Sequence, residues 1–212
     1  MAYVKQFTFN PFFENSYVLY DDSKECIIID PGCIDQSEKR DLTNFIKEHR
    51  LIPQRLINTH CHIDHIFGNQ FISAAYNLEL EANFIEEANI KEAANFAMAL
   101  GVPDPNSPLP SKNLEGGGNI TFGNTTLQIL FTPGHSAGHV TLFSEPDRFA
   151  ISADVLFMGG IGRTDLPGGD FDTLIRTIKE QLYPLGDDVT IFPGHGPETT
   201  IGREKHSNPF LT

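Results

Sequence analysis

The sequence predicts a single mixed α/β domain that spans residues 1–212. Two observations predict this class. Segments with the two-residue apolar period of β-strands alternate along the chain with segments that have the helical period. No linker or low-complexity stretch separates them, and a chain of 212 residues is long enough to bury one substantial core.

The first part of the chain predicts an antiparallel meander, then a helix and a strand. The three strands of the meander are expected at residues 4–9, 16–20 and 25–29, with turn-forming residues between them. Asp30-Pro31-Gly32 ends the third strand, and apolar residues at helical spacing then predict a helix from about residue 37 to 49. The next strand is expected at residues 54–58.

The rest of the chain repeats this alternation. A helix is predicted at residues 84–100 and an amphipathic helix at residues 171–182. Residues 101–118 contain four prolines and three consecutive glycines, which predict a long surface loop. Strands are expected at residues 120–122, 125–131, 140–144, 149–153 and 189–192.

One heptapeptide, Thr59-His-Cys-His-Ile-Asp-His65, contains the densest group of metal-binding side chains. In an extended segment His60 and His62 point to one side and the cysteine between them points to the other, so the thiol is left out of the site. Asp64 and His65 are expected on the first turn of a following helix, where they could bind a second ion. This concentration of imidazoles and carboxylate predicts a metal site.

Three later strands also end in a turn that carries a metal-binding residue. These residues are His135, Asp154 and His195. Pro-Gly pairs precede both histidines and force the chain away from the sheet where each imidazole must be aimed. Strand ends and the loops that follow them are the expected position of functional side chains. His139 is interpreted as a structural residue or as a support for a ligand.

The composition disfavours several classes of function. The net charge of −13 would repel nucleic acid phosphates and acidic membranes, so neither partner is expected. No apolar run has the length needed to span a membrane, and the first nine residues have the pattern of a strand instead of a signal peptide. Three cysteines at irregular spacing predict no disulfide framework, which favours the reducing cytoplasm.

Together these motifs resemble those of the metallo-β-lactamase fold superfamily, over nearly the whole chain. Three further segments narrow the resemblance to the short glyoxalase II-like (hydroxyacylglutathione hydrolase-type) branch, which lacks the C-terminal helical domain of the longer enzymes. These segments are Asn15-Ser-Tyr17, Gly162-Arg-Thr-Asp165 and Pro193-Gly-His-Gly196. The resemblance implies an αββα sandwich of two mixed β-sheets flanked by helices, with a binuclear metal site at one edge.

The resemblance also implies a ligand set. One ion would be held by His60, His62 and His135. The other would be held by Asp64, His65 and His195, with Asp154 bridging both. For these nitrogen and oxygen ligands two zinc ions are expected, although iron or manganese would also fit.

The implied function is metal-dependent hydrolysis of a thioester, such as S-lactoylglutathione or another S-acyl-glutathione, by a metal-bridging hydroxide. Asp64 would orient the attacking water in addition to binding metal. Arg163 would bind the anionic part of this small-molecule substrate, while Asp30 and Thr59 would support the ligands. No oligomeric state is predicted.

Other functions of the same fold are open at this point. A persulfide dioxygenase would use a single iron held by His60, His135 and Asp154. A metal-holding interaction module without turnover is disfavoured because every ligand position is filled. Antibiotic hydrolysis is disfavoured as well, because true β-lactamases usually lack an aspartate at the position of Asp154. Without a helical domain after His195, recognition of glutathione would depend on other groups.

Overall fold

The computed structural model describes residues 1–212 as two compact units. The first unit contains residues 1–113 and 121–125, and the second contains residues 114–120 and 126–212. The first unit contains one six-stranded sheet and the second contains most of another, and both sheets mix parallel and antiparallel pairs. The mixed α/β class predicted from the sequence is therefore confirmed.

The first sheet has the strand order β1-β2-β3-β4-β5-β6. Its strands are β1 (Tyr3–Phe9), β2 (Glu14–Tyr20), β3 (Glu25–Ile29), β4 (Ile52–Ile57), β5 (Leu80–Ala82) and β6 (Lys112–Asn113). The first three strands form the expected antiparallel meander, whereas β3, β4, β5 and β6 pair in parallel. Because Ile29 pairs with Ile57, the segments that follow β3 and β4 leave the sheet at the same edge.

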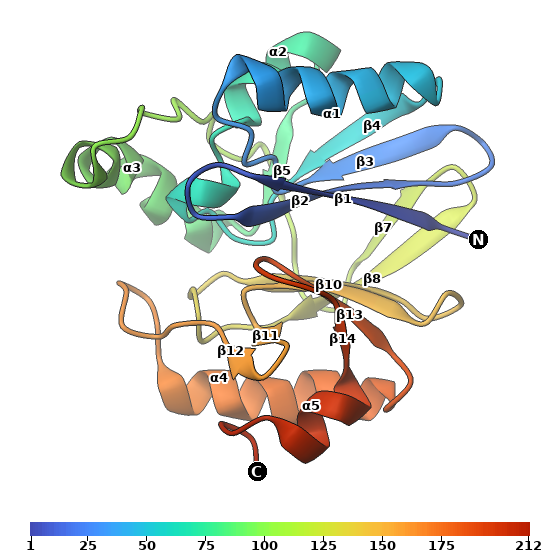
Figure 1. The fold of residues 1–212 in the computed structure, drawn as a ribbon, viewed down its shortest axis with the longest axis vertical. Coiled ribbons are helices and arrows are strands. Elements are labelled where there is room, and N and C mark those ends of the chain that lie inside the picture. The colour runs from blue at the N-terminus through green and yellow to red at the C-terminus, as the bar shows by residue number, and fades with distance from the viewer. The chain divides into compact units, whose positions relative to one another are not determined.

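Three helices complete the first unit, and two of them lie on one face of its sheet (Figure 1). These are α1 (Gln36–Glu48) and α2 (Asn69–Tyr76), while α3 (Glu87–Leu100) follows a 3-10 turn at Phe84–Glu86. Helix α1 begins at an Asp35 cap whose carboxylate accepts hydrogen bonds from two backbone amides of the first turn. Its buried residues Leu42 and Ile46 pack in one apolar cluster with Ile28, Leu56 and other residues of the sheet.

The second sheet has the strand order β14-β13-β10-β9-β8-β7. Its strands are β7 (Asn119–Phe122), β8 (Thr125–Phe131), β9 (Val140–Ser144), β10 (Phe149–Ala153), β13 (Thr190–Pro193) and β14 (Thr199–Thr200). A separate hairpin pairs β11 (Leu156–Phe157) with β12 (Gly160–Ile161). Strands β10 and β13 are parallel, so the segments after them leave the sheet at one edge.

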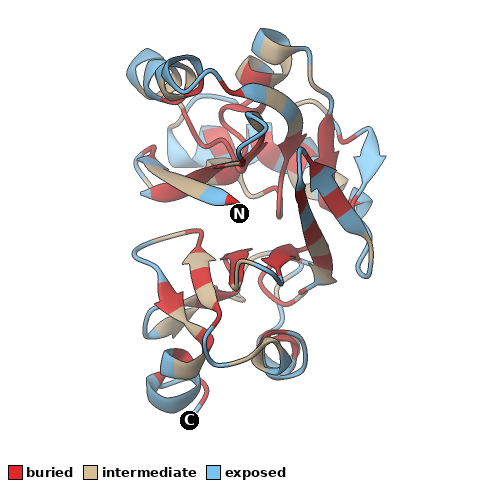
Figure 2. Ribbon diagram, turned by 90° about the vertical axis from the view of Figure 1, so that its right-hand side faces the viewer, coloured by how far each residue is buried: buried red, intermediate tan, exposed pale blue.

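The helices of the second unit, α4 (Phe171–Thr177) and α5 (Ile201–Ser207), lie on one face of its sheet (Figure 1). Leu174 of α4 is buried in a cluster that also contains Ile191 of β13. In both units the inner strands are mostly buried, whereas the helices are buried along one side only (Figure 2). This pattern is expected for amphipathic helices that cover a sheet. None of the helices is long and apolar enough to cross a lipid bilayer.

Several predicted boundaries are wrong. Asp64 lies in a separate 3-10 turn, Ile63–His65, because Ile66 leaves the helical conformation (φ −120°, ψ 0°), and α2 begins only at Asn69. The helix predicted at residues 171–182 changes from α to π geometry at Ile178. The strands β5, β6, β11, β12 and β14 were not predicted, because two or three residues carry too little periodicity. Helix α5 was not predicted either.

The three cysteines are free and buried in the core of the first unit. Loss of hydration raises the pKa of the Cys26 and Cys33 thiols to about 12. The same effect raises the pKa of Cys61 well above its ordinary value. The buried thiol of Cys61 is therefore inert, as expected for a residue outside the metal site.

We therefore expect native protein at pH 8 to resist thiol-specific reagents such as 5,5′-dithiobis(2-nitrobenzoic acid). With a pKa of about 12, only about one thiol in 10⁴ is ionised at that pH, and the thiolate is the reactive form. The same reagent should titrate three thiols after unfolding in guanidinium. Rapid labelling of any cysteine in the native protein would contradict this account of the core.

Candidate metal centre

Four of the predicted ligands lie together in the loop between β4 and α2 of the first unit. His60 and His65 are fully buried, and their ring centroids are 4.2 Å apart. The ring of His62 lies 4.8 Å from that of His60, and the Asp64 carboxylate lies 3.8 Å from His65 Nε2. The first unit thus brings three imidazoles and one carboxylate into one small volume.

The buried carboxylate of Asp30 orients this loop. Its Oδ1 accepts hydrogen bonds from the backbone amide of Thr59 at 2.7 Å and from Asn58 Nδ2 at 3.1 Å. Its Oδ2 accepts from the Thr59 hydroxyl at 2.5 Å and lies 3.2 Å from His65 Nδ1. Because a carboxylate only accepts, Nδ1 of His65 carries the proton, and Nε2 is left with a lone pair that can bind metal.

The hydroxyl of Thr59 fixes His60 in the same tautomer. Its single proton is donated to Asp30, so its oxygen accepts from His60 Nδ1 at 3.2 Å. In the neutral ring the lone pair of His60 is therefore on Nε2. The ligand atoms of Asp30, His60 and His65 also lie within 4.8 Å of one another, but the Asp30 oxygens are already surrounded by donors, so Asp30 is better suited to orient the imidazoles than to bind an ion.

The other three predicted ligands lie together in the second unit. His135, Asp154 and His195 follow β8, β10 and β13. Asp154 Oδ2 lies 3.3 Å from His135 Nε2 and 3.5 Å from His195 Nε2. Nδ1 of His135 donates to the backbone carbonyl of Arg163 at 2.7 Å, so in the neutral ring the lone pair is on Nε2, the nitrogen that lies near the carboxylate. A divalent cation between these atoms would bind both, so the donor set fits a metal ion.

Unusual backbone geometry aims the carboxylates at both strand ends. Asp30 itself has φ +48°, and Ala153, which precedes Asp154, has φ +40°. The pairing of β10 with β13 shifts register between Ile151 and Ala153, so the strand bulges just before the ligand. Residues with side chains rarely adopt positive φ, and such strain is concentrated at functional sites.

Arg163 contributes to this site in a way that the sequence did not indicate. Its carbonyl oxygen fixes the tautomer of His135. Its exposed guanidinium forms a bidentate pair with Asp165, with both N···O distances at 2.7 Å. The hydrogen bonds from Arg163 hold the pKa of the Asp165 carboxyl down at about 2.

Glu14 is a second residue that the sequence did not single out. Its side chain is fully buried, and Oε1 lies 3.7 Å from His65 Nδ1. Burial raises the pKa of this carboxyl well above its ordinary value. A β-carbon on Gly32 would lie 2.1 Å from Glu14 Oε2 and 2.5 Å from the carbonyl oxygen of Asp64, so glycine is required where these segments meet.

The remaining histidines lie outside the two ligand clusters. His139 is buried, and its Nδ1 lies 3.0 Å from the hydroxyl of Thr132, which agrees with the structural role predicted for it. His49 caps the end of α1, where its Nδ1 lies 3.0 Å from the carbonyl oxygen of Phe45.

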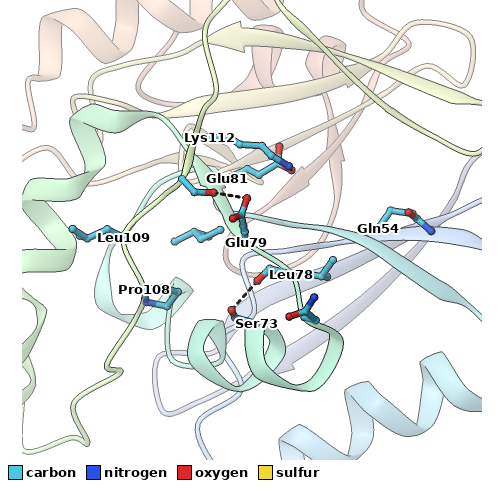
Figure 3. Close-up of a pocket in the computed structure, with 11 residues that line it drawn as sticks. Gln54, Ser73, Leu78, Glu79, Glu81, Pro108, Leu109 and Lys112 are labelled. Carbon is cyan, nitrogen blue, oxygen red and sulfur yellow. Dashed lines mark hydrogen bonds and ion pairs between the residues drawn. The ribbon is translucent and has the colours of Figure 1, made fainter.

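The first unit also contains a pocket of about 540 Å³ that none of the predicted ligands lines (Figure 3). It lies beside β5 and β6, and its wall includes Leu78, Glu79, Pro108 and Lys112. A hydrogen bond from Ser111 to Glu79 ties part of this wall together. The pocket is therefore a feature separate from the imidazole cluster.

The sequence matches the family described as the metallo-beta-lactamase superfamily over residues 9–195. The chain belongs to this superfamily. It is 38% identical over 206 residues to hydroxyacylglutathione hydrolase GloC of Haemophilus influenzae, with 94% of this chain and 93% of that protein covered. It is 36% identical to the probable metallo-hydrolase YqgX of Bacillus subtilis, with 95% and 93% covered.

Two solved structures with more than 30% sequence identity share the fold. The BLEG-1 B3 metallo-beta-lactamase has a TM-score of 0.91 at 34% identity, with 99% of this chain and 100% of that chain covered. TTHA1623 in a di-iron-bound form has a TM-score of 0.88 at 35% identity, with 98% and 100% covered. The predicted metallo-β-lactamase-like fold is therefore confirmed, and the chain is an enzyme of the metallo-hydrolase type whose fold binds divalent metal ions.

The loop that carries His135 provides a test of this geometry. Gly134 has φ +131°, and a β-carbon there would lie 2.4 Å from the backbone of Leu174 in α4. Gly134→Ala should therefore lower the free energy of unfolding in urea. Gly117→Ala is the matched control, because Gly117 also has a positive φ (+85°) but has open space around it.

We expect the control to lose about 1–2 kcal/mol from backbone strain alone. Gly134→Ala should lose about 1–3 kcal/mol more, because the added methyl overlaps a packed helix. Equal losses in the two variants would show that close packing against α4 does not fix the position of the His135 loop.

Proposed function

We propose that the two ligand clusters together hold two divalent metal ions. One ion would be held by His60, His62 and His135. The other would be held by Asp64, His65 and His195, with Asp154 bridging both. The proposal is supported most strongly by the grouping of these histidines and aspartates within each unit, and by the hydrogen bonds to Nδ1 of three of the imidazoles. On this proposal residues 1–212 act as one catalytic domain.

We infer that the reaction is hydrolysis of a thioester, with S-lactoylglutathione or another S-acyl-glutathione as the substrate class. The inference is supported by the 38% identity to a hydroxyacylglutathione hydrolase over nearly the full length of both chains. Divalent ions in such a site lower the pKa of water and polarise a carbonyl oxygen, which is the chemistry this reaction requires. Zinc suits the ligands, and the di-iron form of a related structure supports iron as the alternative.

The residues of the chain prepare this chemistry in three ways. Asp30 and Thr59 keep Nε2 of two imidazoles available for metal. The backbone carbonyl of Asp64 accepts a hydrogen bond from Asn10, which fixes this part of the loop. The partly exposed carboxylate of Asp64 would accept a hydrogen bond from the attacking water and orient it. The leaving thiolate of a glutathione ester is a weak base, so no protein acid is needed to protonate it.

Arg163 is proposed to bind the anionic part of the substrate. Its side chain is 61% exposed and that of its present partner Asp165 is 68% exposed, so a substrate carboxylate could replace that partner. The three buried free thiols support a reducing location such as the cytoplasm.

The decisive experiment is elemental analysis of the purified protein together with an assay on S-lactoylglutathione. About two equivalents of metal and metal-dependent release of glutathione would support the proposal. Oxygen uptake on glutathione persulfide with one equivalent of iron would instead support the dioxygenase alternative. Replacing Asp154 by Asn tests the bridging role within the same experiment.

Asp154→Asn should reduce the metal content from about two equivalents toward one and lower kcat at least 100-fold, because the bridging charge is lost. Asp172→Asn is the control, since Asp172 is an exposed carboxylate on α4 and should leave both quantities unchanged. Circular dichroism would establish that both variants remain folded. Full activity with two bound ions in Asp154→Asn would refute the bridging role.

Arg163→Ala should raise KM for an anionic thioester several-fold with little change in kcat, as expected when uniform substrate binding is lost. Arg176→Ala, which removes an exposed guanidinium of α4, should change neither constant. Arg163→Lys should give an intermediate KM, because the charge is kept without the bidentate geometry. An unaltered KM in Arg163→Ala would mean that this guanidinium serves only its pair with Asp165.

A further inference from the structure

A chain of side-chain hydrogen bonds connects the loop at residue 107 to Asp30 within the first unit. Ser107 Oγ lies 2.8 Å from Asn69 Nδ2, which lies 2.7 Å from Asn58 Oδ1. Nδ2 of Asn58 donates to Asp30 Oδ1 at 3.1 Å and to the backbone carbonyl of His65 at 2.9 Å. Asn58 and Asn69 are both fully buried, so no solvent competes for these contacts.

The direction of every bond in this chain is fixed from its two ends. The Asp30 carboxylate and the His65 carbonyl can only accept, so Asn58 must present its Nδ2 to them and its Oδ1 to Asn69. Asn69 must then present Nδ2 as the donor. At the far end the Ser107 hydroxyl donates to the carbonyl of Pro108 at 3.1 Å, so its oxygen is free to accept from Asn69.

This chain of hydrogen bonds lowers the stability of the folded protein at one atom. Oδ1 of Asn69 is buried and has no hydrogen-bond partner. Leaving such an acceptor unsatisfied costs about 1–3 kcal/mol. A leucine of similar size at the start of α2 would avoid that cost, but it would leave the Oδ1 of Asn58 without a donor. Position 69 therefore needs an amide, because its N–H groups donate to Asn58 and Ser107.

We propose that Asn69 is a positioning residue for the metal centre. It donates to Oδ1 of Asn58 and so holds that amide in place against Asp30 and the carbonyl of His65. Asp30 in turn accepts from His65 Nδ1 and from the Thr59 hydroxyl that orients His60. The inference rests on the proposed role of His60 and His65 as metal ligands. Asn69 acts through three intervening residues and touches no ligand itself.

The test compares two buried asparagines. Asn69→Leu removes the donor to Asn58. Asn208→Leu is the matched control, because Asn208 is also fully buried, and its Nδ2 donates to the carbonyl of Gly160 and to Glu204, neither of which is a proposed ligand. Zinc affinity would be measured by competition with a chromophoric chelator, and thermal stability would be recorded for each variant.

We expect Asn69→Leu to weaken zinc binding about tenfold, at the lower end of the effects seen when partners of metal ligands are removed. Asn208→Leu should lower the melting temperature but leave zinc affinity unchanged. Equal zinc affinity in wild type and Asn69→Leu, or an equal loss in both variants, would overturn the inference. If Asn69→Leu does not fold, Asn69→Asp replaces the donor by an acceptor of the same shape and should weaken zinc binding to the same extent.

A second measurement needs no metal. The imidazole nitrogen resonances of His65 in metal-free wild type should show one well-defined Nδ1–H tautomer, whereas in Asn69→Leu they should be shifted or broadened, because the contact with Asp30 is held less firmly. Unchanged His65 resonances in the variant would overturn the inference. If this difference is seen while wild type binds no zinc, the network stands and the proposed metal centre fails.

Discussion

The His60–His65 loop of the first unit depends on one carboxylate that can only accept hydrogen bonds. The Asp30 carboxylate accepts two hydrogen bonds from Thr59, one from Asn58 and one from His65. Since a carboxylate has no proton to give, each surrounding group is forced to be the donor. As a result both imidazoles, when neutral, carry their proton on Nδ1 and their lone pair on Nε2. An amide at position 30 could both donate and accept, so the same contacts would no longer specify one tautomer.

The two units use the same construction to present their ligands. In each, a pair of parallel strands ends at one edge of the sheet, and the chain turns sharply before the functional side chain. In each unit that turn is made by a non-glycine residue with positive φ, which is Asp30 in the first unit and Ala153 in the second. Regular strand geometry would alternate the side chains across the sheet, so a break in the strand is needed to aim them elsewhere.

This construction places unusual demands on the interior of the first unit. Glu14, Asn58, Asn69 and His65 are all fully buried beside an otherwise apolar core. Such groups cost stability unless they are paired, and Asn69 retains an unpaired oxygen. The neighbouring apolar cluster, with α1 packed on β3 and β4, supplies the burial that offsets this cost. The free energy of unfolding is thus lower than an apolar interior would give, but the polar groups fix the geometry around the imidazoles.

Periodicity determined the strands and long helices of this protein, and the spacing of histidines and aspartates determined which residues could bind metal. Both are local properties of the chain, and they can be predicted from neighbouring residues. The tautomers, the buried Glu14 and the amide chain through Asn69 were decided only by the tertiary structure. Thr59 and Asp30 are 29 residues apart, and Ser107 and Asn69 are 38 apart. Whether such groups come into contact depends on how β3, β4 and the loop near residue 107 pack. The donor and acceptor in each hydrogen bond can be assigned only once those contacts are known.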